Sequence, residues 1–411
     1  MRNTIVVATI GILISTSSCW HISEEWVNFD DWSSLDPTKC FVPFSTSVEE
    51  LDDAFVEEAV TKTTSCNVAE LSKEFISNTG TRHARSYCGT YMSIDENGDP
   101  IRLSGRIILP RNGKVSRIML VSHFTIGSNT EAPSVSFPME GLFSGWGVAV
   151  ICPDYLGYGV SSDRIHPYLC SNLTARNVVD MYFAALPFLE HLGSKPEYDD
   201  IFLFGYSQGG ATTLAVQRLL EQSYTDTRIR LNMAGGGPYD ICATYDNLIE
   251  TDDTDYPCAI PMIIQGMNVG EHLDLDYSQF FKPRMMDNLD LWVNSKTYCM
   301  DDVTELIGSN RVSDIMTELA MNKVSDNMDK LYLAMLDNSV VTYFYPEAPM
   351  YIFHSMDDNV VPYENMVSLR NELDENANVI YNVGKYGPHR LGFVRFLTTC
   401  IGLLESRGDI K

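Results

Sequence analysis

From about residue 88 onward, short apolar runs alternate with longer amphipathic segments. The apolar runs are typical of strands buried in a parallel sheet, and they are "VSRIMLVSH", "WGVAVICPDY", "IFLF", "RIRLNMAGGGPYD" and "PMYIFHS". Residues 172–192 and 211–222 carry apolar side chains at helical spacing. Alternating strands and helices predict an α/β fold, with a mostly parallel central sheet and helices on both faces.

Two regions depart from this alternation. The stretch "YMSIDENGDPIRLSGRIILP" contains two apolar segments around Asn97-Gly98, which predicts a β-hairpin. Residues 20–87 show no clear strand pattern, so we expect residues 19–87 to form an N-terminal extension that packs against the domain.

Between residues 244 and 335 the strand pattern stops and several helix-like stretches follow. We expect a helical lid insertion at 244–335, between a first core part (88–243) and a second (336–411). The insertion holds nine of the chain's 18 methionines. These methionines either fill an irregular core or form an adaptable apolar wall over a binding site, with Met285 and Met286 as candidate substrate contacts.

The first 18 residues resemble a signal peptide: Arg2 precedes an apolar run from Ile5 to Ile14, and small polar residues follow. The apolar run is too short to span a bilayer as a helix, so we expect an exported, extracytoplasmic protein. The following "STSSC" resembles a loose bacterial lipobox, which would place a lipid anchor on Cys19, but a serine-rich signal-peptidase site explains the same residues. Free secretion and lipoprotein anchoring both remain open.

Composition narrows the classes of partner. A net charge of −26, from 55 acidic and 29 basic residues, repels phosphate backbones and anionic lipid headgroups, so we expect no nucleic acid partner. The ten cysteines show no C-x-x-C spacing, so we expect no metal site, and their pairing cannot be read. Cys152, inside an apolar run, is expected to be a small buried residue.

The strand "IFLF" runs into Gly205-Tyr206-Ser207-Gln208-Gly209, which fits G-x-S-x-G. In that motif the serine sits on a strained turn between a strand and a helix, with glycines that leave room for it. The alternative is a glycine-rich turn with an incidental serine. The strand before the motif and the amphipathic segment after it favour a nucleophilic Ser207.

A serine nucleophile needs a base and a group that orients the base. After the strand "PMYIFHS", Asp357 and Asp358 fall at the strand's carboxyl end, and His389 follows in a Gly-Pro-rich loop before the last helix. The chain order serine, acid, histidine is that of α/β-hydrolases. His354 is a rival base, but it lies within the strand and precedes the acid.

The transition state also needs amide donors for its oxyanion. We expect one from the backbone of Gln208, which follows the nucleophile, and a second from the loop after "IMLVSH", where Phe124 is preferred and Thr125 comes next. Thr125 and Tyr206 are also candidate substrate contacts.

Several motifs together resemble those of the secretory lipase group of α/β-hydrolases and related bacterial esterases: "SHFTIGSNT", "CPDYLGYGVSS", "HPYL", "GYSQGG", "GGGPYD" and "APMYIFHSMDDNVVPYEN". The resemblance spans about residues 85–245 and 337–400. It implies an α/β-hydrolase fold with a helical lid, and a triad of Ser207, Asp358 and His389. The group usually has His-Gly where this chain has His123-Phe124, and the larger residue is expected to narrow the acyl site.

The sequence therefore predicts an exported serine ester hydrolase that acts on a small-molecule or lipid ester and needs no cofactor. A serine peptidase on the same fold is one alternative, although no added domain that would capture a peptide amine is evident. A catalytically inactive binding protein is another, although such proteins usually lose a triad member and none is missing here.

Overall fold

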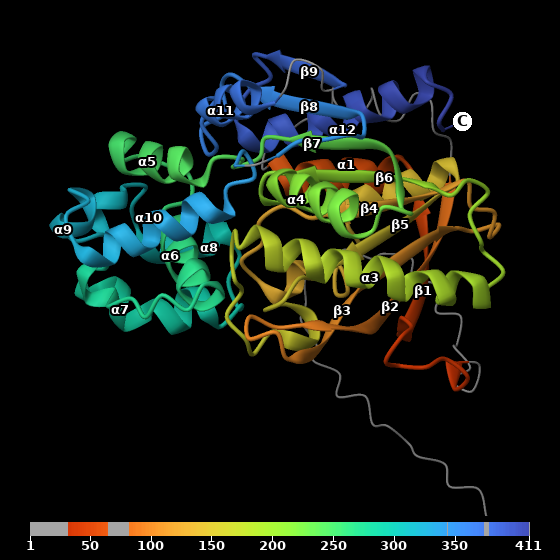
Figure 1. Ribbon diagram of the computed structural model, residues 1–411, viewed down its shortest axis with the longest axis horizontal. Coiled ribbons are helices and arrows are strands. Elements are labelled where there is room, and N and C mark those ends of the chain that lie inside the picture. Colours follow the sequence, from red (N-terminus) through yellow and green to blue (C-terminus); the bar gives the residue numbers. More distant parts are fainter. Residues whose placement is uncertain (1–31, 65–81, 343, 374–377, 411) are drawn as a thin grey trace, which may run out of the picture.

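A computed structural model describes residues 32–64, 82–342, 344–373 and 378–410 (Figure 1). Within these residues a nine-stranded sheet has the order β1-β2-β3-β5-β4-β6-β7-β8-β9. The strands are β1 Val42–Leu51, β2 Arg82–Ile94, β3 Pro100–Pro110, β4 Arg117–Ser122, β5 Val148–Pro153, β6 Asp200–Tyr206, β7 Arg228–Gly235, β8 Met350–Ser355 and β9 Val379–Gly384. From β5 to β9 neighbouring strands are parallel, and β1, β2, β3 and β5 pair antiparallel. The mostly parallel sheet is thus confirmed.

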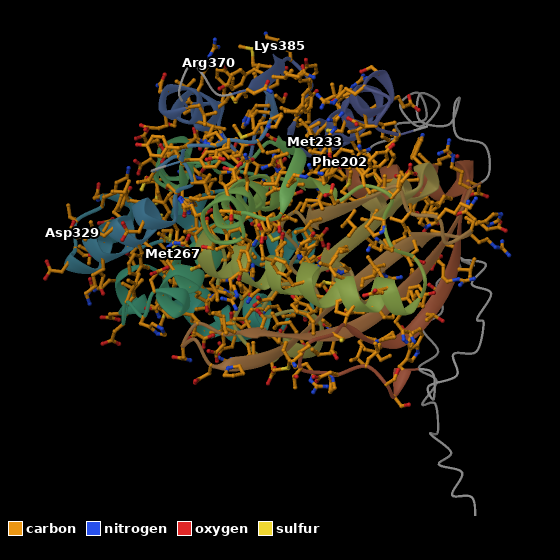
Figure 2. All side chains as sticks on the ribbon, turned by 45° about the vertical axis from the view of Figure 1, so that its right-hand side comes forward. Phe202, Met233, Met267, Asp329, Arg370 and Lys385 are labelled. Atoms are coloured by element: carbon orange, nitrogen blue, oxygen red, sulfur yellow. The ribbon has the colours of Figure 1, made fainter. Side chains whose placement is uncertain are left out.

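Helices cover both faces of this sheet, as predicted. One face packs against α3 Ser171–His191, α4 Gln208–Ser223 and α11 Glu364–Glu372. The other face packs against α1 Asp53–Thr64, the 3-10 segment η3 Met139–Trp146 and α12 His389–Ser406. Figure 2 shows Phe202 and Met233 within this layered core and Lys385 at the surface.

The hairpin predicted around Asn97-Gly98 is present. Strands β2 and β3 pair antiparallel from Ala84 with Pro110 to Ile94 with Pro100. Gly98 has a φ of 79°, the left-handed conformation that glycine adopts without strain.

The structure corrects the expected N-terminal extension. Strand β1 pairs with β2 along the edge of the sheet, β2 begins at Arg82, and α1 packs Phe55 and Val56 into the core. The register of β1 shifts between Pro43 and Ser45, and such a bulge breaks the period-two alternation that identifies a strand in a sequence. Residues 42–64 are therefore part of the core domain.

A group of helices lies between β7 and β8, at the carboxyl end of the sheet and on the left of Figure 1, and is called the cap here. Its α-helices are α5 Ile241–Thr251, α6 Ala259–Gly270, α7 Pro283–Leu289, α8 Met300–Ile307, α9 Glu318–Met321 and α10 Asp326–Asn338. The cap has its own hydrophobic core, which contains Met262, Met267, Met285, Met316, Met328 and Met335. Most of its methionines thus fill a helical core.

The eight cysteines among the described residues form no disulfide, and Cys152 is buried in the sheet as expected. The expected signal peptide and Cys19 lie outside the described residues. No helix in the described part of the chain is both long enough and apolar enough to cross a membrane.

Candidate active site

Ser207 occupies a sharp turn between β6 and α4. Its φ of 57° and ψ of −126° form a strained conformation for a residue with a side chain. A Cβ atom at Gly205 would lie 2.0 Å from the carbonyl oxygen of Gly209, and one at Gly209 would lie 1.9 Å from that of Ser122. Both glycines of the G-x-S-x-G motif are therefore required by close backbone approach.

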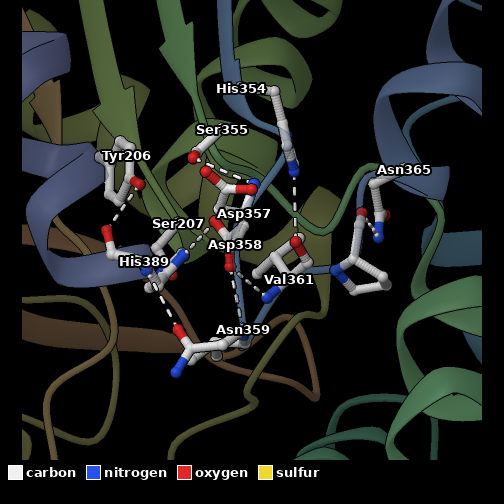
Figure 3. Close-up of polar contacts among 12 residues, drawn as sticks. Tyr206, Ser207, His354, Ser355, Asp357, Asp358, Asn359, Val361, Asn365 and His389 are labelled. Carbon is white, nitrogen blue, oxygen red and sulfur yellow. Dashed lines mark hydrogen bonds and ion pairs between the residues drawn. The ribbon is translucent and has the colours of Figure 1, made fainter. Parts of the chain in front are cut away.

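Ser207, His389 and Asp358 form a continuous chain of hydrogen bonds (Figure 3). His389 Nε2 lies 2.9 Å from Ser207 Oγ, and His389 Nδ1 lies 2.6 Å from Asp358 Oδ2. Asp358 Oδ1 accepts from the amides of Val360 and Val361 at 3.0 and 2.8 Å. Burial raises the pKa of the Asp358 carboxyl, but His389 and the other donors outweigh burial and lower the pKa below its usual value. The carboxylate is thus held charged.

The neighbouring acid and the rival histidine lie elsewhere. The side chain of Asp357 is exposed, whereas that of Asp358 is fully buried. His354 is buried within β8, its Nε2 lies 3.2 Å from the carbonyl oxygen of Val361, and burial lowers its pKa. Of the two aspartates and two histidines, Asp358 and His389 are the pair hydrogen-bonded in line with Ser207.

Sequence reasoning missed three residues whose hydrogen bonds hold the segments around Ser207, His389 and Asp358 in place. The Asn359 side chain accepts from the amide of His389 at 3.1 Å and donates to Asp255 of the cap. Ser355 Oγ donates to the carbonyl oxygen of Gly387 at 2.7 Å, which ties the end of β8 to the loop before α12. His166 contacts Gln208, as described next. All three lie within motifs noted in the sequence, His166 in "HPYL" and the other two in "APMYIFHSMDDNVVPYEN", but neither motif indicated these contacts.

The two residues expected to supply oxyanion amides, Gln208 and Phe124, lie near Ser207: Gln208 follows it in the chain, and Phe124 lines the same cavity. Gln208 begins α4, and amides in a first helical turn have no partner within the helix. Its side chain Nε2 lies 2.8 Å from His166 Nε2. Burial lowers the pKa of His166 to about 3, and its Nδ1 donates to the carbonyl oxygen of Leu156, so Nε2 of the neutral ring accepts the bond from Gln208. The Tyr155 hydroxyl donates to the carbonyl oxygen of His123, whose peptide carries the Phe124 N–H on its opposite side.

A cavity of about 470 Å³ opens at Ser207 and His389. Phe124, Thr125 and Tyr206 also line it, and Phe124 packs against Phe393 with ring centroids 5.3 Å apart. The cap contributes Leu248, Ala259, Ile263, Cys299 and Met300. Helix α1 contributes Phe55 and Ala59, and η3 with the residues just before it contributes Phe137, Met139 and Glu140. Burial raises the pKa of Glu140 to about 7. The walls are mostly apolar, with carboxyl groups at a few points.

Met285 and Met286 are a correction to the prediction, because neither lines this cavity. Met285 is buried in the hydrophobic core of the cap, and Met286 is partly exposed at the surface. A methionine on an amphipathic helix looks the same in a sequence whether its helix turns it toward a core or toward a cavity. Met300 is the cap methionine that reaches the Ser207 cavity.

No cluster of three or more His, Cys, Asp or Glu side chains suited to a metal ion occurs in residues 32–64, 82–342, 344–373 and 378–410. The groups at Ser207 are a hydroxyl, an imidazole, a carboxylate and backbone amides. This set is suited to acyl transfer through a covalent serine intermediate.

The sheet, the serine turn and the placement of His389 after β9 define an α/β-hydrolase fold. The family model described as "Secretory lipase" matches residues 130–384, more than half of the chain. The protein therefore belongs to the secretory lipase family and is a hydrolase of the lipase and esterase type. Ser207 and Asp358 lie within the matched range, and His389 follows shortly after it.

Two solved structures illustrate the fold. The rice cell wall degrading esterase LipA from Xanthomonas oryzae is similar with a TM-score of 0.70 and 19% identity, over 89% of this chain and 97% of that one. Candida antarctica lipase A is similar with a TM-score of 0.57 and 16% identity, over 74% of this chain and 73% of that one. A search of curated protein sequences gave no significant match.

Proposed function

We propose that the protein is an exported serine ester hydrolase in which Ser207, His389 and Asp358 form the catalytic triad. The observation that carries the proposal is the pair of contacts at His389, 2.9 Å to the Ser207 hydroxyl and 2.6 Å to the Asp358 carboxylate. A base with one nitrogen on the nucleophile and the other on a buried carboxylate has the geometry that activates a serine.

In this mechanism Ser207 Oγ attacks the ester carbonyl while His389 Nε2 takes the hydroxyl proton. The carbonyl oxygen becomes an oxyanion, which the amides of Gln208 and Phe124 stabilise. The C–O bond to the alcohol then breaks, and His389 returns the proton to the leaving alcohol. Water attacks the acyl-enzyme by the same route in reverse, which releases the acid and restores Ser207. Asp358 holds the imidazole in the tautomer with Nδ1–H and stabilises its charged form.

The apolar walls of the Ser207 cavity support an ester with a hydrophobic acyl or alcohol part. Phe124, in place of the usual glycine, fills part of the cavity next to Phe393. We propose that the cap acts as a lid over the substrate, because its residues Leu248, Ile263 and Met300 form one wall of the cavity. Removal of that wall is expected to impair long substrates more than short ones.

A fluorophosphonate probe tests the nucleophile directly. We expect stoichiometric labelling, with the modified peptide containing Ser207 and labelling lost in the Ser207→Ala variant. Hydrolysis of p-nitrophenyl esters is then compared with that of an aminoacyl anilide. A label on another residue would exclude the proposed triad, faster cleavage of the anilide would favour a peptidase, and absence of both labelling and turnover would favour a binding protein.

Export is proposed from the leader-like first 18 residues, and membership of a secretory family supports it. The mature protein is either free or anchored through a lipid on Cys19. Mass spectrometry of the mature N-terminus distinguishes the two forms, because a lipidated cysteine adds the mass of its acyl chains. A mature protein that retains Met1 would contradict export by this route.

A further inference from the structure

A second, smaller cavity of about 20 Å³ lies between the cap and the loop before α3, and is called the Lys296 cavity here. This volume exceeds the roughly 10–15 Å³ that one water molecule needs. Tyr158 and His166 line it on the core side, and Cys258 and Trp292 line it on the cap side. Tyr168 and Met300 line both this cavity and the Ser207 cavity, so the two share a wall.

Lys296 brings a buried positive charge to this cavity. The residue is 6% exposed. Among the described residues, its Nζ hydrogen-bonds only to the carbonyl oxygens of Arg164 at 3.4 Å and Asn294 at 3.2 Å, and the Tyr158 ring lies 5.7 Å away. No ion pair joins it to a carboxylate of the described residues, and burial is what lowers its pKa, to about 8. A buried cation without a counter-ion is costly, and here it occurs in a chain with a net charge of −26.

Gln265 adds an unsatisfied donor to the same cavity. It is 2% exposed, and its Nε2 has no hydrogen-bond partner among the described residues. The amide orientation follows from Asn294, whose Nδ2 donates to the Asp290 carboxylate at 2.9 Å and to Gln265 Oε1 at 2.8 Å. Because Asp290 accepts, Asn294 must present its NH₂ group, and Gln265 must present its oxygen to Asn294.

We propose that the Lys296 cavity binds a carboxylate group, held by the Lys296 ammonium and the Gln265 amide. Two donors beside aromatic walls suit a small planar group with two acceptor oxygens. A phosphate would bring further oxygens, and three of the other polar side chains here are engaged: His166 with Leu156 and Gln208, Tyr158 with Ile126, and Tyr168 with Thr125. The carboxylate belongs either to an ester substrate with a second acidic end, a source that rests on the proposed function, or to a free carboxylic acid.

Thermal unfolding in sodium acetate, compared with sodium chloride at equal ionic strength, tests carboxylate binding without any turnover. We expect acetate to raise the Tm of the wild type by about 1–2 °C more than chloride does at concentrations near ten times the Kd. Lys296→Met and Gln265→Leu should abolish this difference. Lys282→Met is the matched control, because Lys282 is an exposed cap lysine whose Nζ also donates to a backbone carbonyl, that of Ser313.

An equal acetate effect in the wild type and in both cavity variants would overturn the proposal, and so would the absence of an effect in the wild type. If Lys296→Met does not fold, Gln265→Leu carries the test, since it leaves the cation in place and removes only the amide. Because binding is measured without turnover, this result stands even if Ser207 proves not to be the nucleophile.

Kinetics then identify the source of the carboxylate. The mono-p-nitrophenyl ester of glutaric acid is compared with its methyl-capped form, and the ratio of their kcat/KM values is the readout. A fall of about tenfold in that ratio in Lys296→Met assigns the cavity to an acidic substrate. An unchanged ratio together with a lost acetate effect assigns it to a free acid. An unchanged ratio with an unchanged acetate effect rejects the site.

Discussion

The sheet and the cap contribute to the Ser207 cavity in different ways. On the sheet side, Ser207 follows β6, Asp358 follows β8 and His389 begins α12. Hydrogen bonds donated by backbone amides hold all three, two of them to side-chain oxygens. On the cap side, apolar residues such as Leu248 and Met300 form a wall above a methionine-rich core. Proton transfer needs atoms fixed to a fraction of an ångström, whereas an apolar wall needs only volume and low polarity.

The largest expected effect lies on the sheet side. Ser207→Ala removes the proposed nucleophile without removing core volume. We therefore expect kcat to fall on the order of 10⁶-fold, the loss seen when the catalytic serine of subtilisin is removed. The Tm should stay within a few degrees of the wild type. Stopped assays on a short-chain ester measure the loss, and a purified variant that keeps most of its activity would place the nucleophile elsewhere.

Two adjacent aspartates give the next test. Asp358→Asn keeps the side chain's size but favours the wrong tautomer of His389, and kcat should fall by roughly 10⁴-fold. Asp357→Asn is the matched control, because that side chain is exposed, and its kcat should stay within about tenfold. Both variants are measured on one short-chain ester at neutral pH. The reverse ranking would assign the acid to Asp357.

Acid should lower the free energy of unfolding through two buried histidines, His123 and His166. Burial lowers the pKa of His123 from 6.5 to about 4 and that of His166 to about 3, so both are neutral in the folded state. Because the folded pKa values lie below the unfolded value, the stability that these histidines contribute is complete above about pH 6.5. It is lost as the pH falls through the folded pKa values, and the loss is about 3 kcal/mol for His123 alone. Urea unfolding at several pH values measures this slope. His166→Gln should make it shallower, and an identical slope would mean that His166 is charged when folded.

The smallest effects are expected from the cap, where two methionines can be compared. Met300→Ala removes an apolar side chain from the wall of the Ser207 cavity. A long-chain ester loses that contact and an acetate ester does not, so the ratio of their kcat/KM values should fall about tenfold. Met285→Ala should instead cost about 2–5 kcal/mol of unfolding free energy and change both esters alike, because Met285 packs in the cap core. Equal losses across chain lengths for Met300→Ala would show that this wall is structural.

Local sequence signals identified the parts of the fold that depend on local rules. Strands buried on both faces are continuous apolar runs, the Asn97-Gly98 turn needs a left-handed glycine, and the turn at Ser207 needs glycines where backbones approach. Edge strand β1 was missed because its bulge interrupts the alternation and because it gains its stability from pairing with β2, which begins more than 30 residues later. Ser207, Asp358 and His389 could be predicted as candidates because their order and neighbouring motifs are encoded in the chain.

The tertiary structure alone decided which side chains meet. Asp357 and Asp358 are adjacent acids in one loop, and only the fold turns Asp358 into the buried position beside His389. Met285 and Met300 both lie on short cap helices. The packing of those helices places Met285 in the cap core and Met300 in the wall of the Ser207 cavity. The sequence determined the elements and the reactive groups because these depend on neighbours in the chain. It left open the Gln208–His166 contact and the Lys296 cavity, because these depend on the packing of segments distant in sequence.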